Sequence, residues 1–391
     1  MTTFALRHFS SPRALRGVQP KFLFALLGRY AEYFASRGVD VAVHGEQRPN
    51  YDAIATVLMT PTERTPAELV DDLYYVDDMA TRDGMDALVE AVETAGYALE
   101  GDISTPYDVA VQVRLRWPAI IERKHAEHAI AHRRRTFEYL QCRPGTEASF
   151  LTPTPERISA IEAHLSNRFR DLKRGAVCSV FVFDRPDGVW ILVRRGDPFK
   201  RDGAIEADGP SSVYYRPERY DVLRYDSRRG ELAVNADSNK KLVAVYRDAM
   251  GVLLFNDAHS FAPGYKYTLD PLHQDAEAAL VCSDIEGIDS ITLKEVQVYA
   301  GGPEGETYVR RAKRDLLAGL RRAGRTLPPL GIVRATFSVK FTGVKEPLSV
   351  TIRSQNVASY THDTDAALVE EWLRRRGFIV EWTQVAHARA A

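Results

Sequence analysis

The sequence predicts an α+β protein, in which a helical N-terminal region precedes a mostly antiparallel sheet region with a few helices. Three observations predict this class. Residues 1–175 carry apolar side chains at helical spacing behind several capping signals. After about Gly175 the apolar period becomes that of strands. These strands are joined mostly by tight turns, which favour an antiparallel sheet over a doubly wound parallel one.

The helical region shows several helix starts. A first helix is expected to begin at Pro20 and to end at Gly38. The next helical segment opens on Thr-Pro-Ala-Glu, where Thr65 would cap the helix and Glu68 would complete a capping box. The same Thr-Pro start recurs at two later positions, Thr105 and Thr154.

The region after Gly175 predicts two hairpins first. Residues 176–195 place strands on both sides of an Arg-Pro-Asp-Gly turn, and residues 212–236 do so around Ser-Arg-Arg-Gly. The remaining predicted elements are a helix, a strand pair, a helix, two strands and a last helix, over residues 237–251, 290–311, 312–324, 332–341, 348–354 and 363–378. We therefore expect three domains: a helical domain (1–175), an antiparallel β-rich domain (176–270) and an α+β domain (271–391).

Composition and motifs exclude several function classes. The net charge is −1, so any nucleic-acid surface must be local. The three cysteines, Cys142, Cys178 and Cys282, are widely spaced, which favours a reducing cytoplasm over a disulfide framework or a zinc site. No apolar run approaches the roughly 20 residues of a membrane span, so membrane insertion is not expected. The common signatures of P-loop ATPases, dinucleotide enzymes, zinc proteases and serine hydrolases are missing.

Charge is unevenly distributed in the helical region. Residues 60–108 hold 13 acidic and 2 basic side chains, whereas residues 114–135 hold 7 Lys or Arg and 2 Glu. The simpler interpretation is two solvated helical faces. The alternative is an acidic face that docks a protein partner or a second copy of the chain, beside a basic contact face.

Three histidines lie in the basic segment at helical spacing. His125, His128 and His132 would share one helix face with neighbouring apolar side chains. We expect packing or interface histidines rather than a metal site, because no carboxylate lies beside them on that face. Arg133 and Arg134 would point away from it, toward phosphate or water.

Clusters of basic and aromatic residues are the stronger functional lead. Guanidinium groups pair with phosphate and aromatic rings stack on exposed bases, so Arg with Tyr suits nucleic acid. Residues 305–325 alone hold 7 basic and 2 acidic side chains. The candidate nucleic-acid-binding residues outside the histidine segment are Arg194, Arg195, Lys200, Arg201, Tyr214, Tyr215, Arg310, Arg311, Lys313 and Arg314. The first four of these, Lys200 and Arg201 included, are expected in a loop after a strand. The competing interpretation is core aromatics with solvated arginines at turns.

A divergent Mg²⁺-dependent nuclease of the PD-(D/E)xK kind is the alternative. Its site needs one acid near a strand that carries a further acid and a polar or basic residue in alternation. Glu295 and Gln297, with Asp284 or Asp289, fit a degenerate form of this pattern. A weaker option is Glu231 with one of two acids, Asp221 and Asp226.

One block of sequence resembles a known family. VFDRPDGVWILVRRGDPFKRDGAI, RYDVLRYDSRRGELAVNA and GVLLFNDAHSF follow one another within residues 182–261. This order is similar to the sheet region of the DNA-binding subunit of the bacterial Kiwa antiphage system and its uncharacterised relatives. The resemblance covers about 80 residues and rests on pattern. It implies a cytoplasmic bacterial protein, found with phage-defence genes, that binds DNA or a partner without conventional catalysis.

The leading hypothesis is thus a bacterial nucleic-acid-associated accessory or sensor protein in antiphage defence, with DNA favoured over RNA as its partner. No cofactor is expected, and Mg²⁺ only if the nuclease alternative holds. A non-catalytic assembly protein that docks a partner on its acidic helices is the remaining alternative.

Overall fold

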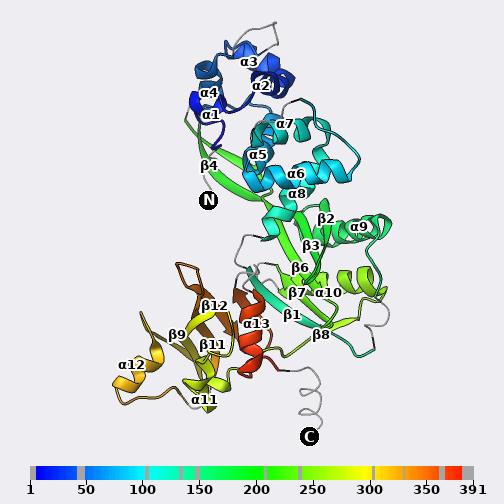
Figure 1. Cartoon of the computed structure of the whole chain (residues 1–391). Helices are drawn as coiled ribbons and strands as arrows, with labels where there is room; N and C mark the ends of the chain where they lie inside the picture. The colour runs from blue at the N-terminus through cyan, green and yellow to red at the C-terminus, as the bar shows by residue number, and fades with distance from the viewer. Residues whose placement is uncertain are drawn as a thin grey trace. The chain divides into compact units, whose positions relative to one another are not determined.

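The computed structural model describes residues 6–41, 49–101, 105–131, 135–145, 150–206, 209–236, 240–301, 304–328, 331–360 and 366–380. They divide into two compact units, residues 1–129 and residues 130–391 (Figure 1). The first unit is helical and the second is built on a large antiparallel sheet. The predicted α+β class is therefore confirmed. Within the described ranges, no helix combines the length and the apolar character that a membrane crossing requires.

The N-terminal unit packs its helices around one apolar core. Its helices are α1 Pro12–Leu15, α2 Pro20–Leu27, α3 Ala31–Ser36, α4 Tyr51–Met59, α5 Ala67–Met79, α6 Arg82–Thr94, α7 Pro106–Arg116 and α8 Pro118–Ala131. Phe9, Leu23, Phe34, Ile54 and Val76 are completely buried in this core. They come from five separate segments, so the core requires the whole unit.

The capping signals predict some helix starts and miss others. Thr105 accepts a hydrogen bond from the backbone N–H of Asp108 at the start of α7, as expected. The expected cap at Thr65 is wrong, because Pro66 occupies the cap position of α5. The Thr65 hydroxyl instead accepts from the N–H of Thr62, at 2.8 Å. Thr81 caps a second helix, α6, so the predicted helical segment is interrupted.

The buried carboxylate of Asp72 connects three helical segments of this unit. It accepts hydrogen bonds from Arg29 (2.8 Å), Tyr30 (2.7 Å) and Arg114 (2.7 Å). Asp72 is 2 % exposed, so these three donors replace the hydrogen bonds that water would otherwise make to it. Burial and the neighbouring carboxylate raise the pKa of Tyr30 well above its usual value, which keeps this phenol protonated as a donor. Part of the acidity of residues 60–108 is thus internal.

We expect Asp72→Ala to destabilise the N-terminal unit by about 3–5 kcal/mol, because Tyr30 and Arg114 would lose their shared buried acceptor and Arg114 would keep only Glu122. Urea unfolding followed by circular dichroism measures this loss. The matched control is Asp86→Ala on the exposed face of α6, which should shift the free energy of unfolding by less than about 0.5 kcal/mol. Equal effects of the two substitutions would contradict a central role for Asp72.

The main sheet of the second unit is antiparallel. In spatial order its strands run β10-β9-β11-β12-β13-β1-β7-β6-β3-β2, and β8 also pairs with β1. Their bounds are β1 Arg135–Cys142, β2 Cys178–Arg185, β3 Gly188–Gly196, β6 Glu218–Asp226, β7 Glu231–Asn235, β8 Phe261–Pro263, β9 Ile288–Gly301, β10 Glu306–Arg311, β11 Ile332–Phe341, β12 Leu348–Arg353 and β13 Val357–Tyr360. The antiparallel pairing of β2 with β3 and of β6 with β7 confirms the two predicted hairpins.

The sheet does not respect the expected domain boundaries. Strand β1 lies in the middle of the sheet order, between β13 and β7. It was expected to belong to a helical domain that ends at residue 175, but the compact helical unit ends at Ala129. The expected boundary between residues 270 and 271 also falls within one sheet, since β7 and β13 both pair with β1.

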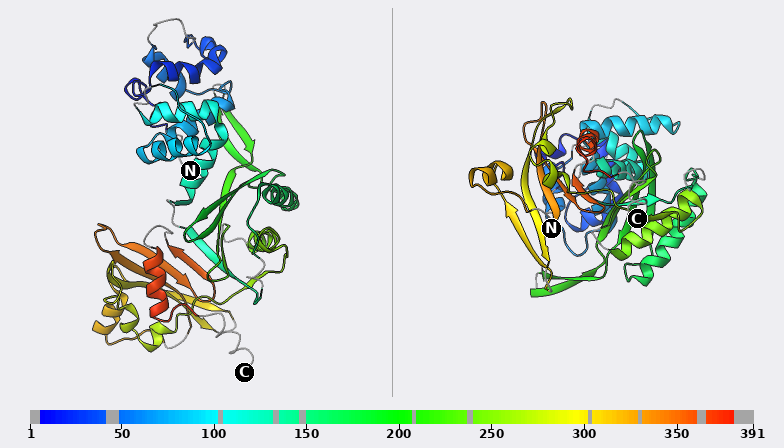
Figure 2. Two further views of the ribbon diagram at one scale, coloured as in Figure 1. Left: turned by 45° about the vertical axis from the view of Figure 1, so that its right-hand side comes forward. Right: turned by 90° about the horizontal axis from the view of Figure 1, so that it is seen from below.

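Helices cover the two faces of this sheet in different places (Figure 2). The helices α9 Pro155–Asp171 and α10 Lys240–Phe255 pack on the β2–β7 part, where Phe169 of α9 meets Tyr246 of α10. Thr154 caps α9, as predicted. On the other face, α13 Ala366–Arg375 packs Trp372 against Phe337 of β11, with ring centroids 5.0 Å apart. The shorter helices α11 Pro271–Gln274 and α12 Leu316–Arg322 complete this unit.

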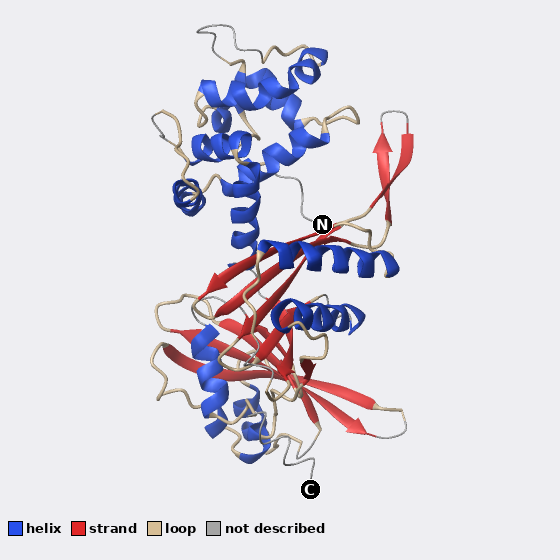
Figure 3. Cartoon of the chain, turned by 90° about the vertical axis from the view of Figure 1, so that its right-hand side faces the viewer, coloured by secondary structure: helices blue, strands red, loops and turns tan. Residues whose placement is uncertain are grey.

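Strands β4 Lys200–Glu206 and β5 Gly209–Tyr215 form a separate two-stranded ribbon, which projects beyond the main sheet (Figure 3). Two expectations are corrected here. Lys200 and Arg201 begin a strand and do not belong to a loop. The segment expected to be one strand from residue 212 is broken at Pro217, so that β5 pairs with β4 and β6 pairs with β3.

Candidate functional site

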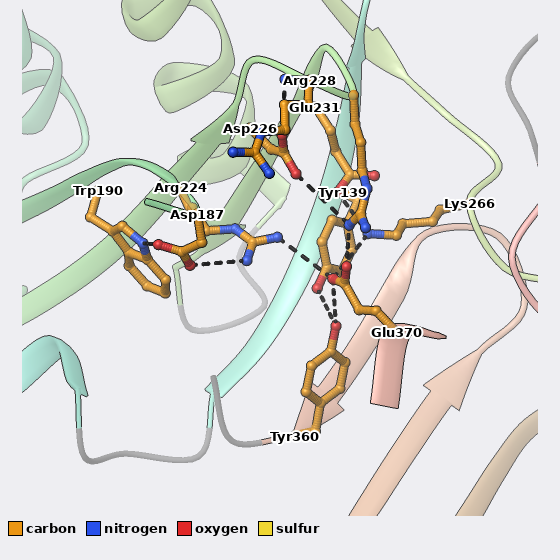
Figure 4. Close-up of polar contacts among 11 residues, drawn as sticks. Tyr139, Asp187, Trp190, Arg224, Asp226, Arg228, Glu231, Lys266, Tyr360 and Glu370 are labelled. Carbon is orange, nitrogen blue, oxygen red and sulfur yellow. Dashed lines mark hydrogen bonds and ion pairs between the residues drawn. The ribbon is translucent and has the colours of Figure 1, made fainter. Parts of the chain in front are cut away.

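A buried ionic cluster lies where α13 meets strands β6, β7 and β1 (Figure 4). Its centre is the carboxylate of Glu370, a residue of α13 that is 5 % exposed. Glu370 accepts hydrogen bonds from Arg229 and from the hydroxyl of Tyr360, the latter at 3.0 Å. The ammonium of Lys266 lies 3.8 Å from it and the guanidinium of Arg224 lies 3.6 Å from it.

Lys266 occupies a closed environment beside this carboxylate. It is 3 % exposed and donates to Glu231 of β7 at 2.6 Å. Its ammonium also lies over the ring of Tyr139, 3.7 Å from the centroid, which is a cation–π contact. Lys266 and Arg224 thus face two buried carboxylates, Glu231 and Glu370, so the charges of the interior balance.

The pKa values in the cluster follow from burial and charge together. Burial alone would raise the pKa of Glu370, but Lys266, Arg224 and Arg229 outweigh it and hold that pKa well below its usual range. Burial alone would lower the pKa of Lys266, but Glu231 raises it. Burial raises the pKa of Tyr139 and of Tyr360. Glu370 and Lys266 therefore stay charged near neutral pH, and the phenols of Tyr139 and Tyr360 remain protonated.

A cavity of about 800 Å³ opens over one side of this cluster. Three segments line it: the β2–β3 turn, the β6–β7 turn and the exposed side of α13, with Phe150 beside them. Five arginines contribute to the lining, Arg185, Arg224, Arg228, Arg229 and Arg374. The β2–β3 turn requires glycine at position 188. Gly188 has φ +132°, and a Cβ there would lie 2.3 Å from the carbonyl oxygen of Tyr225.

Arg224 is the deepest arginine of this cavity. It is 6 % exposed, and its guanidinium extends from β6 between Asp187 and Glu370 (Figure 4). Nη1 donates a long hydrogen bond of 3.4 Å to Asp187. Among the described residues, Nε and Nη2 have no hydrogen-bond acceptor, although Nη2 lies 3.6 Å from Glu370 as an ion pair. Buried donors are normally satisfied, so these two are an exception.

The residues proposed from the sequence lie elsewhere in this unit. Arg195 is 2 % exposed and donates to Asp221 twice, at 2.5 and 3.0 Å, so it is not available for a phosphate contact. Arg194 is half-buried and donates to Ser179. Arg201 and Tyr214 are exposed on the ribbon and directly opposed in register. The predicted contact residues Arg133 and Arg134 lie outside the described residues.

Lys200 and Tyr215 share the other face of the ribbon with a carboxylate. Lys200 lies 2.9 Å from Asp202, and the Tyr215 hydroxyl donates to the same group at 2.7 Å. The hydrogen bond from Lys200 lowers the pKa of Asp202, so this pair is charged near neutral pH. The charge of Lys200 is therefore partly neutralised.

The second basic cluster is distant from the ribbon. Arg310 lies over the ring of Tyr308, Arg311 pairs with Glu295, and the side chains of Lys313 and Arg314 are exposed. Seven strands separate β10 from β3 in the sheet order. At about 4.8 Å per strand, the two clusters are about 38 Å apart along the sheet. They do not form one surface patch.

The acids of the expected nuclease site are not brought together. Glu295 is buried and pairs with Arg311 and Arg334. Asp289 lies six residues earlier in β9, which is about 20 Å along an extended strand. Asp284 is held by Arg375 and Arg376. In the weaker option, Asp221 pairs with Arg195 and Glu231 with Lys266, whereas Asp226 is directly opposite Glu231 in the β6–β7 pairing. Within the described ranges, no group of three His, Cys, Asp or Glu could hold a metal ion.

The histidine segment behaves as a packed helix face at its one buried position. His125 is 4 % exposed, and its Nε2 lies 3.0 Å from Asp78 of α5. Its ring also meets Tyr74 and Tyr75 edge-on. The hydrogen bond with His125 lowers the pKa of Asp78. We expected no carboxylate beside these histidines on their own helix, and Asp78 comes instead from another helix, α5. His132 lies outside the described residues.

Comparison with known proteins adds no family. No protein-family model matches the sequence, and no curated protein is found to be similar to it. The functional argument therefore rests on the residues of this chain. Sequence reasoning missed Lys266 because it is a single basic residue between two tyrosines. It missed Glu370 because that residue stands among the other charged residues of a helix, Glu371 and Arg374 included. The Ser-Arg-Arg-Gly turn was visible as a basic turn, and it proves to be one wall of the cavity.

We expect Glu370→Gln to destabilise the sheet unit by about 3–5 kcal/mol at neutral pH, because Lys266 and Arg224 would lose a buried counter-charge. The folded pKa of Glu370 lies below its usual 4.5, so this stabilisation is present above that pH and is lost as the pH falls further. The difference between wild type and variant should shrink on acidification, measured by urea unfolding at a series of pH values.

Glu371→Gln is the matched control for this substitution. Glu371 is half-exposed and pairs with Arg375 on the helix surface, so its loss should cost at most about 1 kcal/mol. A pH-independent effect of Glu370→Gln, or one no larger than that of Glu371→Gln, would contradict the role assigned to the cluster.

Proposed function

We propose that this chain is a nucleic-acid-associated accessory or sensor protein of bacterial antiphage defence, and that the β4–β5 ribbon is its contact with DNA. The observation that supports the contact is the direct pairing of Arg201 with Tyr214 on one ribbon face. Tyr214 is 67 % exposed, and neither side chain has a hydrogen-bond or ion-pair partner within the described part of the chain. The described residues of that face carry no carboxylate.

The dimensions of the ribbon suit a nucleic-acid groove. Each strand has seven residues, which corresponds to about 23 Å of extended chain. The DNA major groove admits a two-stranded ribbon of this kind. The guanidinium of Arg201 would pair with phosphate, and the Tyr214 ring would stack on a base where bases are exposed.

Further groups at the base of the ribbon extend this surface. Phe199 is 64 % exposed, and the guanidinium of Arg216 lies over its ring at 4.2 Å from the centroid. Arg216 also donates to the backbone of Lys173, which places a third exposed cation close by. Arg201, Arg216 and Lys173 together supply about three phosphate contacts. The defence context comes from the Kiwa resemblance and remains part of the proposal.

Arg201→Ala and Tyr214→Ala should each weaken binding to a fluorescent DNA duplex about tenfold, because one removes a phosphate contact and the other an aromatic surface. With about three phosphate contacts, wild-type affinity should fall roughly fortyfold between about 50 and 200 mM salt. Fluorescence anisotropy measures both effects. Arg201→Ala should also lower the salt dependence by about one contact, whereas Tyr214→Ala should not.

Arg170→Ala is the matched control, since Arg170 is an exposed arginine of α9 that is not part of the ribbon. It should leave DNA affinity unchanged. Absence of binding at low salt, or equal losses in Arg170→Ala and Arg201→Ala, would refute the ribbon as the contact. Single-stranded DNA and RNA in parallel titrations test the preference for duplex DNA.

A second candidate function is favoured by the tip of the ribbon. Ile205, one residue before the end of β4, is 84 % exposed, so an apolar side chain is presented to solvent. Val213 is 48 % exposed and lies on the opposite face of the ribbon. Such a ribbon could dock a protein partner or a second copy of the chain. Ile205→Asp should then convert an oligomer to a monomer in light scattering. A wild-type monomer would remove the self-association form of this candidate.

A further inference from the structure

We propose that the cavity between the β2–β3 turn, the β6–β7 turn and α13 binds a small phosphate-bearing molecule of nucleotide size. This site is separate from the ribbon, and it goes beyond the proposed nucleic-acid contact. Its volume of about 800 Å³ lies in the range of small-molecule sites, about 300–1,000 Å³.

The first argument is the unsatisfied guanidinium of Arg224. Arg224 lines the cavity and is only 6 % exposed. Its Nε and Nη2 groups have no acceptor among the described residues. A buried donor without an acceptor costs free energy. An oxyanion in the cavity would supply the missing acceptors, and a guanidinium edge with two parallel N–H groups matches phosphate geometry.

The second argument is that most carboxylates in the cavity lining already have hydrogen-bond or ion-pair partners. The lining contains five arginines and five carboxylates, so the total charge is balanced. Three of those carboxylates are already engaged by neighbours. Asp187 accepts from Trp190 at 2.9 Å, Asp226 accepts from the backbone of Arg228 at 3.0 Å, and Glu371 pairs with Arg375. Glu370 is saturated by the buried cluster.

The arginines are less committed than the carboxylates. The side chains of Arg228 and Arg374 are exposed and have no hydrogen-bond or ion-pair partner within the described ranges. Two exposed guanidinium groups with free donors therefore line the cavity beside the buried Arg224, against Asp184 as the exposed carboxylate without a described partner. The donors that remain after internal pairing therefore favour an anion.

The shape of the lining also favours a ligand with more than a phosphate. Phe150 lines the same cavity and stacks on Tyr225 with an interplanar angle of 15°. Its ring offers an apolar surface to a planar group such as a nucleobase. The first turn of α13, Ala366 and Ala367, lines the cavity as well and has no side chain beyond Cβ to obstruct it.

The test is isothermal titration calorimetry of the full chain with four probes: ADP, pyrophosphate, adenosine and succinate. We expect ADP and pyrophosphate to bind with one site per chain, ADP more tightly, and adenosine and succinate to bind at least tenfold more weakly than ADP. Pyrophosphate that binds as tightly as ADP would restrict the ligand to the phosphate group. Tight succinate binding, or no binding of either phosphate compound, would overturn the proposal.

Arg228→Ala and Arg374→Ala are the informative variants, because both side chains are at the surface and outside the buried cluster. Each should weaken ADP binding about tenfold with an unchanged melting temperature. Arg224→Met should abolish binding, although its place in the cluster makes folding a condition that circular dichroism must verify. Arg353→Ala, an exposed arginine of β12 outside the cavity, is the matched control and should bind normally.

The ribbon variant Arg201→Ala separates this site from the proposed DNA contact. It should bind ADP like the wild type, whereas Arg228→Ala should bind DNA like the wild type. Failure of the DNA experiment would therefore leave the cavity proposal intact. Loss of ADP binding in Arg201→Ala, or normal ADP binding in both Arg228→Ala and Arg374→Ala, would overturn it.

Discussion

The carboxylate of Glu370 connects parts of the sheet unit that are far apart in the sequence. It comes from α13 near the end of the chain and contacts Arg224 and Arg229 of the β6–β7 hairpin, Lys266 and Tyr360. Removing these charges from water is costly, and it is compensated only when every partner is in place. The position of α13 on the sheet is therefore fixed by charge as well as by the packing of Trp372 on Phe337.

The same constraint shapes the surface above the cluster. Arg229 is held by Glu370, so the turn that carries it has a defined direction, and its neighbour Arg228 is directed to the cavity. On the other wall, Asp187 is held by Trp190 and Arg224. The exposed Arg228 is thus positioned by a neighbouring arginine, Arg229, whose guanidinium is already paired. Preorganisation of this kind lowers the entropic cost of binding a ligand.

Local features of the fold were predictable from the sequence, and the site was not. The Arg-Pro-Asp-Gly turn and the Thr caps at Thr105 and Thr154 depend on neighbours within four residues, and all three are confirmed. Strand β1 was missed because its segment follows a helix and its partners lie about 90 and 220 residues later.

The state of each charged side chain depends on distant residues. Arg195 and Arg201 are both basic residues that flank the same turn, yet one is buried against Asp221 and the other is exposed on the ribbon. The sequence pattern treats them alike, because the difference comes from the strand pairing of β3 with β6 and of β4 with β5. The environment of Lys266 also depends on distant residues, because its partners Glu231 and Glu370 lie 35 and 104 residues away in the sequence.

The central position of β1 has a consequence for synthesis of the chain on the ribosome. One edge of β1 pairs with β7, but residues 135–138 on its other edge have no partner until β13 has been synthesised. Tyr139 of β1 and Tyr360 of β13 are 221 residues apart in the sequence. At about 5–20 residues per second, the interval between the end of β7 and the end of β13 is roughly 6–25 s. During that time the nascent chain presents an unpaired strand edge, which is a template for association with other chains. Expression of this protein should therefore be sensitive to translation rate and to chaperone supply.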